Sequence, residues 1–434
     1  MFKTLASALK DKEIRKKILI VVLLLCVYRL GCFLPVPGLN ATAYSNIIEN
    51  DSVGLLSLLN TVTGSALANA SFFALGVTPY INASIIVQLL TAGIPALERL
   101  SKQGDSGREK INLITKIVAI VLAVAQGVGI VLGYQDTLLP IFGDNLLWLT
   151  GIMVVILLVA GTCFTMWIGD RITSQGIGNG LSLIIFIGII STSAQSIANA
   201  ISSVFTSSIS YLWELLGFIG LAILLFTLIV WVDGAERKIP VQYAKQVKGR
   251  KMYGGQSSHI PMKVNGTGVM PIIFATAIIT FPSLIIGLFW PESNFAQWWG
   301  TYMGTGSIVY SICVALLILF FAYFYAQMQF NPADVSLNIQ QNGGFIPGIR
   351  PGKPTTEYLT RVSRRITLFG AIFLSIIAII PSLLFKYIGQ IIGGTGLVNA
   401  FSATGLLIVV SVAIEFDKSL EAQMLMKNYK GFLK

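Results

Sequence analysis

The stretch "SFFALGVTPYINASIIVQLLTAG", residues 71–93, is long enough and apolar enough to cross a lipid bilayer as a helix. It contains no charged residue, but it carries Pro79, Asn82 and Gln88 well inside its length. A helix that faced only lipid would have little use for amide side chains at that depth. The position of the stretch in the fold therefore depends on what surrounds these polar groups.

Helical spacing places polar and aliphatic residues of this stretch on a common face. Ile81, Ile85, Gln88 and Ala92 recur with the period of a helical turn, and Asn82 lies beside them. This pattern leaves three roles open. The polar groups hydrogen-bond to neighbouring helices, one of them satisfies a carbonyl freed by the proline, or the face lines an aqueous path.

Apolar stretches of this kind recur along the whole chain. Of its 434 residues, 54% are hydrophobic and 11% are charged, about half the charged share of soluble domains. The mean hydropathy is +0.77. These values predict an all-α polytopic membrane protein with ten transmembrane helices. We expect the helices near residues 18–34, 72–92, 112–133, 146–168, 179–200, 212–231, 269–289, 308–328, 366–385 and 398–415.

The basic residues predict the orientation of these helices. All but two of the 30 Lys and Arg residues lie in the N-terminal tail, the even-numbered connections with their helix ends, or the C-terminal tail. The exceptions are Arg29 and Lys386. Because cytoplasmic loops carry the excess of Lys and Arg, we expect both termini to be cytoplasmic.

Ten helices with both ends on one side divide into two halves of five, residues 1–210 and 211–434. An odd number of helices per half means that helix 1 enters from the cytoplasm and helix 6 from outside. If the halves are structural repeats, they are therefore inverted, with any substrate path at their interface.

The external segment 52–70 is too short and too polar to span the membrane. Asp51 or Ser52 could cap a short helix in it. That helix would carry the apolar residues Leu55, Leu56, Leu58, Leu59 and Val62. The small residues that follow, Gly64 among them, indicate close packing or a re-entrant piece held inside the protein. The alternative is a helix that lies on the outer membrane surface.

Two long cytoplasmic loops carry structure of their own. The loop 232–268 has two period-2 segments, "RKIPVQYAK" and "SSHIPMKVN", which predict a hairpin with a tip at Lys248, Arg250 and Lys251. The loop 329–365 begins with a helix, capped by Asn331, and continues into a Pro- and Gly-rich tip with Arg350 and Lys353. We interpret them as two separately structured basic tips. The alternative is that they only determine topology.

Residues typical of enzyme active sites are absent from the expected membrane helices. The sequence has no G-x-x-x-x-G-K-[ST] phosphate loop, and its only histidine, His259, falls in a basic loop. No expected helix carries an acidic residue at its centre, and such residues serve proton- or sodium-coupled transport. "GIGNG" (176–180) indicates a tight turn between two helices. We expect the four cysteines to be reduced, and we predict no catalytic residue, metal or cofactor.

Longer motifs follow one another in an order that resembles a known family. They are "ALGVTPYINASIIVQLLT", "SKQGDSGREKI", "MWIGDRITSQGIGNGLSLIIF", "QSSHIPMKVNGTGVMPIIFA", "NPADVSLNIQQNGGFIPGIRPGKPT" and "LLIVV". From near residue 15 to the C-terminal tail, the chain resembles the SecY/Sec61 family of protein-translocation channels. Two departures are Gln340-Gln341, where the family often has lysines, and the extra stretch between "GGT" (393–395) and "LLIVV".

The resemblance implies a central hourglass pore between the two inverted halves. It implies a ring of aliphatic side chains at Ile81, Ile85, Leu181, Ile185, Ile273 and Ile408, where Leu181 replaces the usual isoleucine. It implies a plug within 55–70, comprising Leu55, Leu58, Leu59, Val62 and Gly64. A lateral gate towards lipid would open between helices 2–3 and 7–8, lined by Gln88 and Phe281.

The resemblance also implies function and partners. The chain would conduct unfolded secretory polypeptides across the bacterial cytoplasmic membrane and release apolar segments sideways into lipid. The basic tips would dock the ATPase motor SecA or ribosomal RNA, and the small subunits SecE and SecG would brace the halves. Signal peptides and precursor chains would be its cargo. The rivals are a secondary transporter for a small solute and a membrane-embedded hydrolase.

Overall fold

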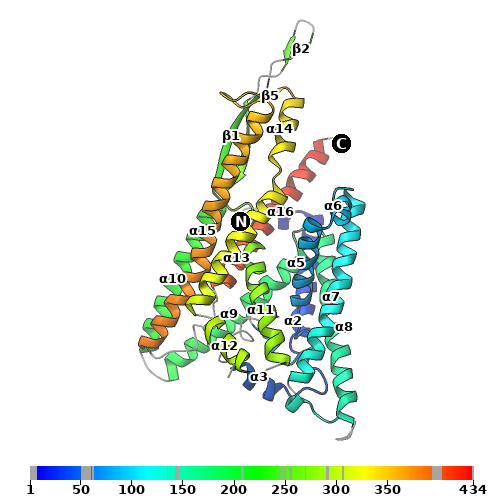
Figure 1. Ribbon diagram of the computed structural model, residues 1–434, viewed down its shortest axis with the longest axis vertical. Helices are drawn as coiled ribbons and strands as arrows, with labels where there is room; N and C mark the ends of the chain where they lie inside the picture. Colours follow the sequence, from blue (N-terminus) through cyan, green and yellow to red (C-terminus); the bar gives the residue numbers. More distant parts are fainter. Residues whose placement is uncertain are drawn as a thin grey trace.

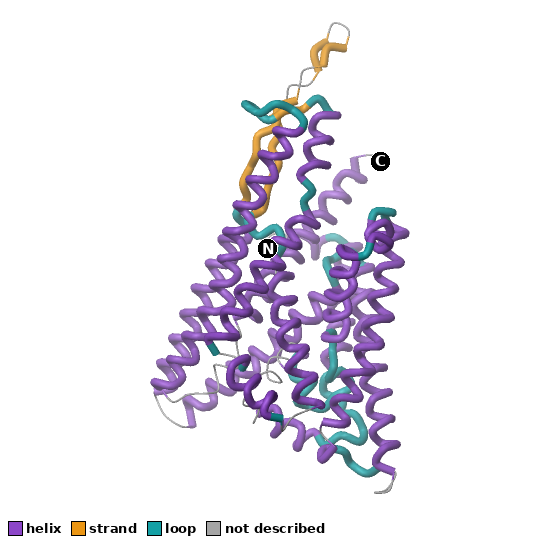
Figure 2. Tube along the Cα trace, viewed as in Figure 1, coloured by secondary structure: helices purple, strands orange, loops and turns teal. Residues whose placement is uncertain are grey.

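The computed structural model forms a tall helical bundle with a small β-sheet at one end (Figure 1). It describes residues 7–49, 60, 63–133, 135–141, 146–206, 210–243, 246–248, 251–253, 257–268, 270–289, 293–304, 307–392 and 403–432. Most of the secondary structure is helical, and the strands are confined to the end that carries the two long loops (Figure 2).

Each of the ten predicted spans overlaps a helix. These helices are α2 (Lys12–Gly31), α5 (Thr78–Gly93), α7 (Asp105–Gly133), α8 (Leu147–Ser174), α9 (Gly180–Thr206), α10 (Ser210–Asp233), α11 (Met270–Phe289), α13 (Ile308–Gln329), α15 (Lys353–Ile392) and α16 (Ala403–Phe432). Within the described residues, five helices are long and apolar enough to cross a membrane, or six if a bent pair counts as one span. The prediction of a multi-pass helical membrane protein is confirmed.

The bent pair comprises α5 and α6 (Pro95–Ser101), which meet at 104°. Helix α5 begins at Thr78, so residues 72–77 of the expected helix form turns and bends instead. Pro79 therefore lies in the first helical turn, where its missing N–H would have had no partner. The interpretation that Pro79 frees a carbonyl inside the helix is wrong.

The helices pack around a large apolar core, with two smaller buried clusters beside it. Helix α5 packs against α7 and α11, α11 packs against α13, and α16 packs against α9, α10 and α15. Helices α9, α11 and α16 lie between the outer helices in Figure 1. The turn 176–180 has positive φ at Gly176 and Gly178. A Cβ on Gly180 would collide with the Gly169 carbonyl, which explains the glycine between α8 and α9.

The two long loops form a single structure. Strand β1 (Glu236–Tyr243) pairs antiparallel with β4 (Ser257–Lys263), as the period-2 pattern predicts, with Ile239 opposite Ile260. Strand β1 also pairs with β5 (Gly344–Phe345), which comes from the second loop and follows α14 (Pro332–Gln341). The prediction of two separately structured tips is wrong, because β1 joins both loops in one sheet of order β4-β1-β5.

This sheet has its own apolar core, separate from the core of the bundle. We call the unit the platform, and its buried residues are Ile239, Val241, Met262, Ile339, Ile346, Leu359 and Val362. The short hairpin of β2 (Gln246–Lys248) and β3 (Lys251–Tyr253) projects from it (Figure 1). The Asn331 side chain accepts a hydrogen bond from the Ala333 N–H and caps α14, as predicted. Helix α15 begins at Lys353 and contributes Leu359 and Val362 to this core, so the platform packs on the first turns of α15.

Short elements complete the opposite end. They are α3 (Ala41–Glu49), the 3₁₀ helix η1 (Gln135–Thr137) and α12 (Asn294–Met303). The four cysteines form no disulfide.

Candidate functional site

The six side chains expected in an aliphatic ring belong to one apolar cluster. They come from four helices: Ile81 and Ile85 from α5, Leu181 and Ile185 from α9, Ile273 from α11 and Ile408 from α16. Ile85, Ile185 and Ile408 are buried, and the other three are partly buried and pack against the same cluster. Segments separated by more than 300 residues along the chain are thus brought together in one apolar cluster.

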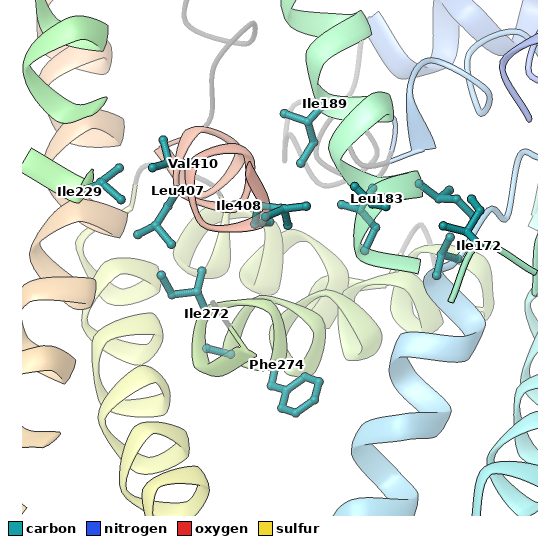
Figure 3. Packing of buried hydrophobic residues seen from close by; sticks show 14 of the residues in the cluster. Ile172, Leu183, Ile189, Ile229, Ile272, Phe274, Leu407, Ile408 and Val410 are labelled. Carbon is teal, nitrogen blue, oxygen red and sulfur yellow. The ribbon is translucent and has the colours of Figure 1, made fainter. Parts of the chain in front are cut away.

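Figure 3 shows the part of this cluster around α16. The Ile408 side chain leaves α16 on the side that faces Leu183 of α9, while Leu407 and Val410 point elsewhere on the same helix. On α11, Ile272 points towards Leu407, whereas Phe274 points away from α16. The "LLIVV" motif therefore lies against α9 and α11 despite the extra stretch before it.

The end of the external segment is held against this cluster by helix α2. The Arg29 guanidinium donates to the Gly64 carbonyl at 2.9 Å and to the Ser191 hydroxyl of α9 at 2.5 Å. One residue earlier on α2, the Tyr28 hydroxyl donates to the Thr63 carbonyl at 3.3 Å. Arg29, a charge well inside the first predicted span, therefore caps a backbone carbonyl.

Gly64 fits this place because it has no side chain. Its φ is +72°, and a Cβ there would lie 2.8 Å from the Cα of Gly188 on α9. Ser65, the next residue, also has a positive φ of 67°. The backbone at 64–65 is thus bent tightly against α9, and Ala66 is buried in the same cluster as Ile185 and Ile408. Of the predicted plug residues, Leu55, Leu58, Leu59 and Val62 lie outside the described residues.

Gln88, expected at a lateral gate, bridges two helices. The Tyr325 hydroxyl of α13 donates to the Gln88 Oε1 of α5. The Gln88 Nε2 in turn donates to the Ser84 hydroxyl at 3.0 Å. Tyr325 also packs against Phe274 of α11, with ring centroids 5.1 Å apart. Phe281, the other expected gate residue, lies two turns from Phe274 on α11 and is partly buried.

The structure also locates the basic residues expected to dock a partner. Arg350 and Lys353 are exposed at the end of the platform, where the Thr355 hydroxyl donates to the Arg350 carbonyl at 2.9 Å. Lys248 and Lys251 are opposite each other in the β2–β3 register. Arg250, between them in sequence, lies outside the described residues.

Sequence reasoning missed the partners of the two key polar residues. Tyr325 is one of several aromatic residues in α13, and Ser191 is one of several small polar residues in α9. Helical periodicity does not distinguish them from their neighbours. A weak signal was available for both, because a lone Arg or Gln at membrane depth requires a partner on a facing helix.

A helical bundle with several candidate membrane spans, and with a basic platform at one end, defines a multi-pass membrane protein. Comparison with known proteins identifies its family. The SecY family model matches residues 71–416, so the chain belongs to the SecY family.

Relatives and solved structures agree with this assignment. The chain is 39% identical over 451 residues to the "Protein translocase subunit SecY" of Streptomyces galbus, and 40% identical over 454 residues to that of Mycobacterium bovis. Both matches cover 100% of each chain. The small-solute transporter is not favoured by these relatives.

The fold is similar to that of solved channels. The structure described as "The structure of a protein conducting channel" matches with a TM-score of 0.66 at 19% identity, and the match covers 93% of this chain and 91% of that one. "Sec61 in the Canine ribosome-channel complex from the endoplasmic reticulum" matches with a TM-score of 0.60 at 17% identity, covering 93% and 91%.

Proposed function

We propose that this chain is the channel subunit of a protein translocase and conducts unfolded polypeptides across the bacterial cytoplasmic membrane. The observation that carries the proposal is the convergence of Ile81, Ile85, Leu181, Ile185, Ile273 and Ile408 in one cluster from four helices. Cargo of diverse sequence cannot be recognised by a specific site. A ring of aliphatic side chains excludes water when closed and yields around any peptide when open.

In this proposal the external segment 55–70 is the plug that closes the ring from outside. Support comes from its end, where Gly64 packs against α9 and accepts a hydrogen bond from Arg29. The halves 1–210 and 211–434 are inverted repeats with the pore between them.

The lateral gate lies between α5 and α7 on one side and α11 and α13 on the other. Helix α11 packs against both α5 and α7, and the Gln88–Tyr325 hydrogen bond joins the two sides. An apolar segment of the cargo would leave sideways through this seam, because each central Leu or Ile favours the membrane by a few tenths of a kcal/mol.

The platform docks the partner that drives transport. Arg350 and Lys353, with Lys248, Arg250 and Lys251 of the hairpin, would contact the SecA motor or ribosomal RNA, the latter with salt-sensitive affinity. SecE and SecG brace the bundle, and both termini are cytoplasmic. The chain itself is a passive conduit, without catalytic residues or a bound cofactor.

Crosslinking tests the ring. Single cysteines replace Ile81 or Ile408 in a background without the four native cysteines, and a secretory precursor is stalled in transit. We expect a crosslink to the precursor from both positions. The control is Ile86→Cys, because Ile86 is exposed on another side of α5. Absence of crosslinks from both ring positions, or an equal yield from position 86, would overturn the proposed path.

Reconstitution tests transport itself. Proteoliposomes with SecE, SecA, ATP and a precursor should protect the precursor from external protease. Uptake of a small solute without any partner would instead support a transporter.

A further inference from the structure

Helix α12 (Asn294–Met303) carries none of the residues assigned above to the ring, the plug, the gate or the platform. It lies between α11 and α13 in sequence and at the end of the bundle opposite the platform (Figure 1). It is well formed, because the Ser293 hydroxyl accepts a hydrogen bond from the Ala296 N–H at 3.0 Å and caps its first turn. Residues 293–304 contain no charged side chain.

One side of α12 carries an exposed row of aromatic rings. Phe295, Trp298 and Tyr302 are 54%, 52% and 47% exposed. Their rings contact one another along the helix, with centroids 5.9 Å apart for Phe295–Trp298 and 5.4 Å for Trp298–Tyr302. We call these three residues the aromatic row. Large exposed rings that contact one another on an outer surface mark an interaction site for an apolar partner or for the membrane.

The other sides of α12 differ sharply from this row. Asn294, Gln297 and Thr301 form an exposed polar row, also spaced at three and four residues. Ala296 and Met303, on a third side, are partly buried. The helix therefore presents an aromatic side, a polar side and a side turned towards the protein. This is the arrangement of a helix that lies in a membrane–water interface.

Helix α12 adjoins a membrane-spanning helix that has an apolar stripe of its own. It packs against α13. On α13, Ile308, Ile312 and Leu316 are exposed and spaced four residues apart, so they form one apolar stripe on a membrane-spanning helix. Trp and Tyr are enriched where such stripes reach the headgroups, because their rings are apolar and their N–H and O–H groups are polar.

We propose that α12 is an interfacial membrane anchor whose aromatic row is immersed at the boundary between acyl chains and headgroups. Because the segment carries no charge, the anchor works through ring burial and needs no anionic lipid. That the leaflet is the outer one rests on the proposed topology, but immersion itself does not depend on transport. The anchor holds the adjoining ends of α11 and α13, which carry one side of the proposed gate, at a fixed depth.

Spin labels test the anchor in the full chain. Single cysteines at Phe295, Trp298, Asn294 or Thr301 are labelled in a cysteine-free background and reconstituted in neutral phosphatidylcholine vesicles. Relaxation by oxygen, which concentrates in lipid, is compared with relaxation by a water-soluble nickel complex. We expect oxygen to dominate at Phe295 and Trp298, and nickel to dominate at Asn294 and Thr301.

Three other results would contradict the proposal. Nickel dominance at Phe295 and Trp298 would place the row in water. Protection of both labels from both reagents would mean that a protein partner covers the row. Dependence of the oxygen signal on added anionic lipid would exclude anchoring by ring burial alone. If the Trp298 variant fails to fold, Phe295 and Asn294 still provide the comparison, and none of these readouts requires translocation.

Discussion

At the scale of single residues, Arg29 joins three parts of the molecule. Its guanidinium connects α2 to the Gly64 carbonyl and to Ser191 of α9. It also lies over the Phe33 ring, at 5.3 Å from the centroid. A charge at membrane depth is expensive unless its donors are satisfied, so this contact holds the end of the external segment against the bundle.

Replacement of Arg29 should loosen that contact. A hydrogen bond to a charged group contributes about 1.5–3 kcal/mol, so Arg29→Gln should raise the displaced population of the segment about tenfold or more. We expect a higher resting ion conductance in planar bilayers. Ser191→Ala, which removes one of the two acceptors, should have a smaller effect. Arg171→Gln, the same change at an exposed residue, is the control, and equal conductance in both Gln variants would contradict the prediction.

Tyr325→Phe should ease opening of the proposed gate. The change removes only the hydroxyl that donates to Gln88 and leaves the ring against Phe274. Interhelical hydrogen bonds in membranes contribute about 0.6 kcal/mol, or about a threefold change in the open population. A graded Leu/Ala series measures how many Leu residues a segment needs to insert into lipid. That number should fall by about one. Tyr323→Phe, on the same helix, should leave that threshold unchanged.

At the scale of elements, sequence patterns predicted what local chemistry specifies. The period-2 segments predicted β1 and β4, and the Asn331 cap predicted α14. The two-residue strand β5 could not be predicted, because Gly344–Phe345 has no pattern and pairs with a strand about 100 residues away. The start of α5 was misjudged because residues 72–77 are apolar, although they form turns and bends.

The platform should depend on its core more than on its surface. Leu359 on α15 is fully buried there, and Leu→Ala at such sites costs about 2–5 kcal/mol. Leu359→Ala should therefore accelerate tryptic cleavage of the basic loops in inverted vesicles. Leu337→Ala, on exposed Leu337 of α14, is the matched control. Similar cleavage rates in the two variants would show that the platform does not depend on this core.

At the scale of the whole molecule, hydropathy predicted where the helices lie but not which of their faces meet. Ile85 is buried and Ile86 is 37% exposed, yet both are isoleucines of one helix. In a membrane, lipid-facing and protein-facing sides are both apolar, so periodicity carries little information about packing. The position of the ring residues therefore came from family resemblance, and their convergence appears only in the folded chain.

The proposed docking of the motor involves the whole molecule, because the platform and the ring residues belong to separate apolar cores. Arg350→Glu reverses an exposed charge at the platform's end without touching its core. A loss of about 1.4 kcal/mol in docking lowers affinity about tenfold, and the loss should shrink at high salt as the charges are screened. ATP-dependent protection of a precursor in proteoliposomes, measured at two salt concentrations, provides the readout. Arg361→Glu makes the same reversal at an exposed position further along α15. Equal protection by the two variants would exclude Arg350 from the docking surface.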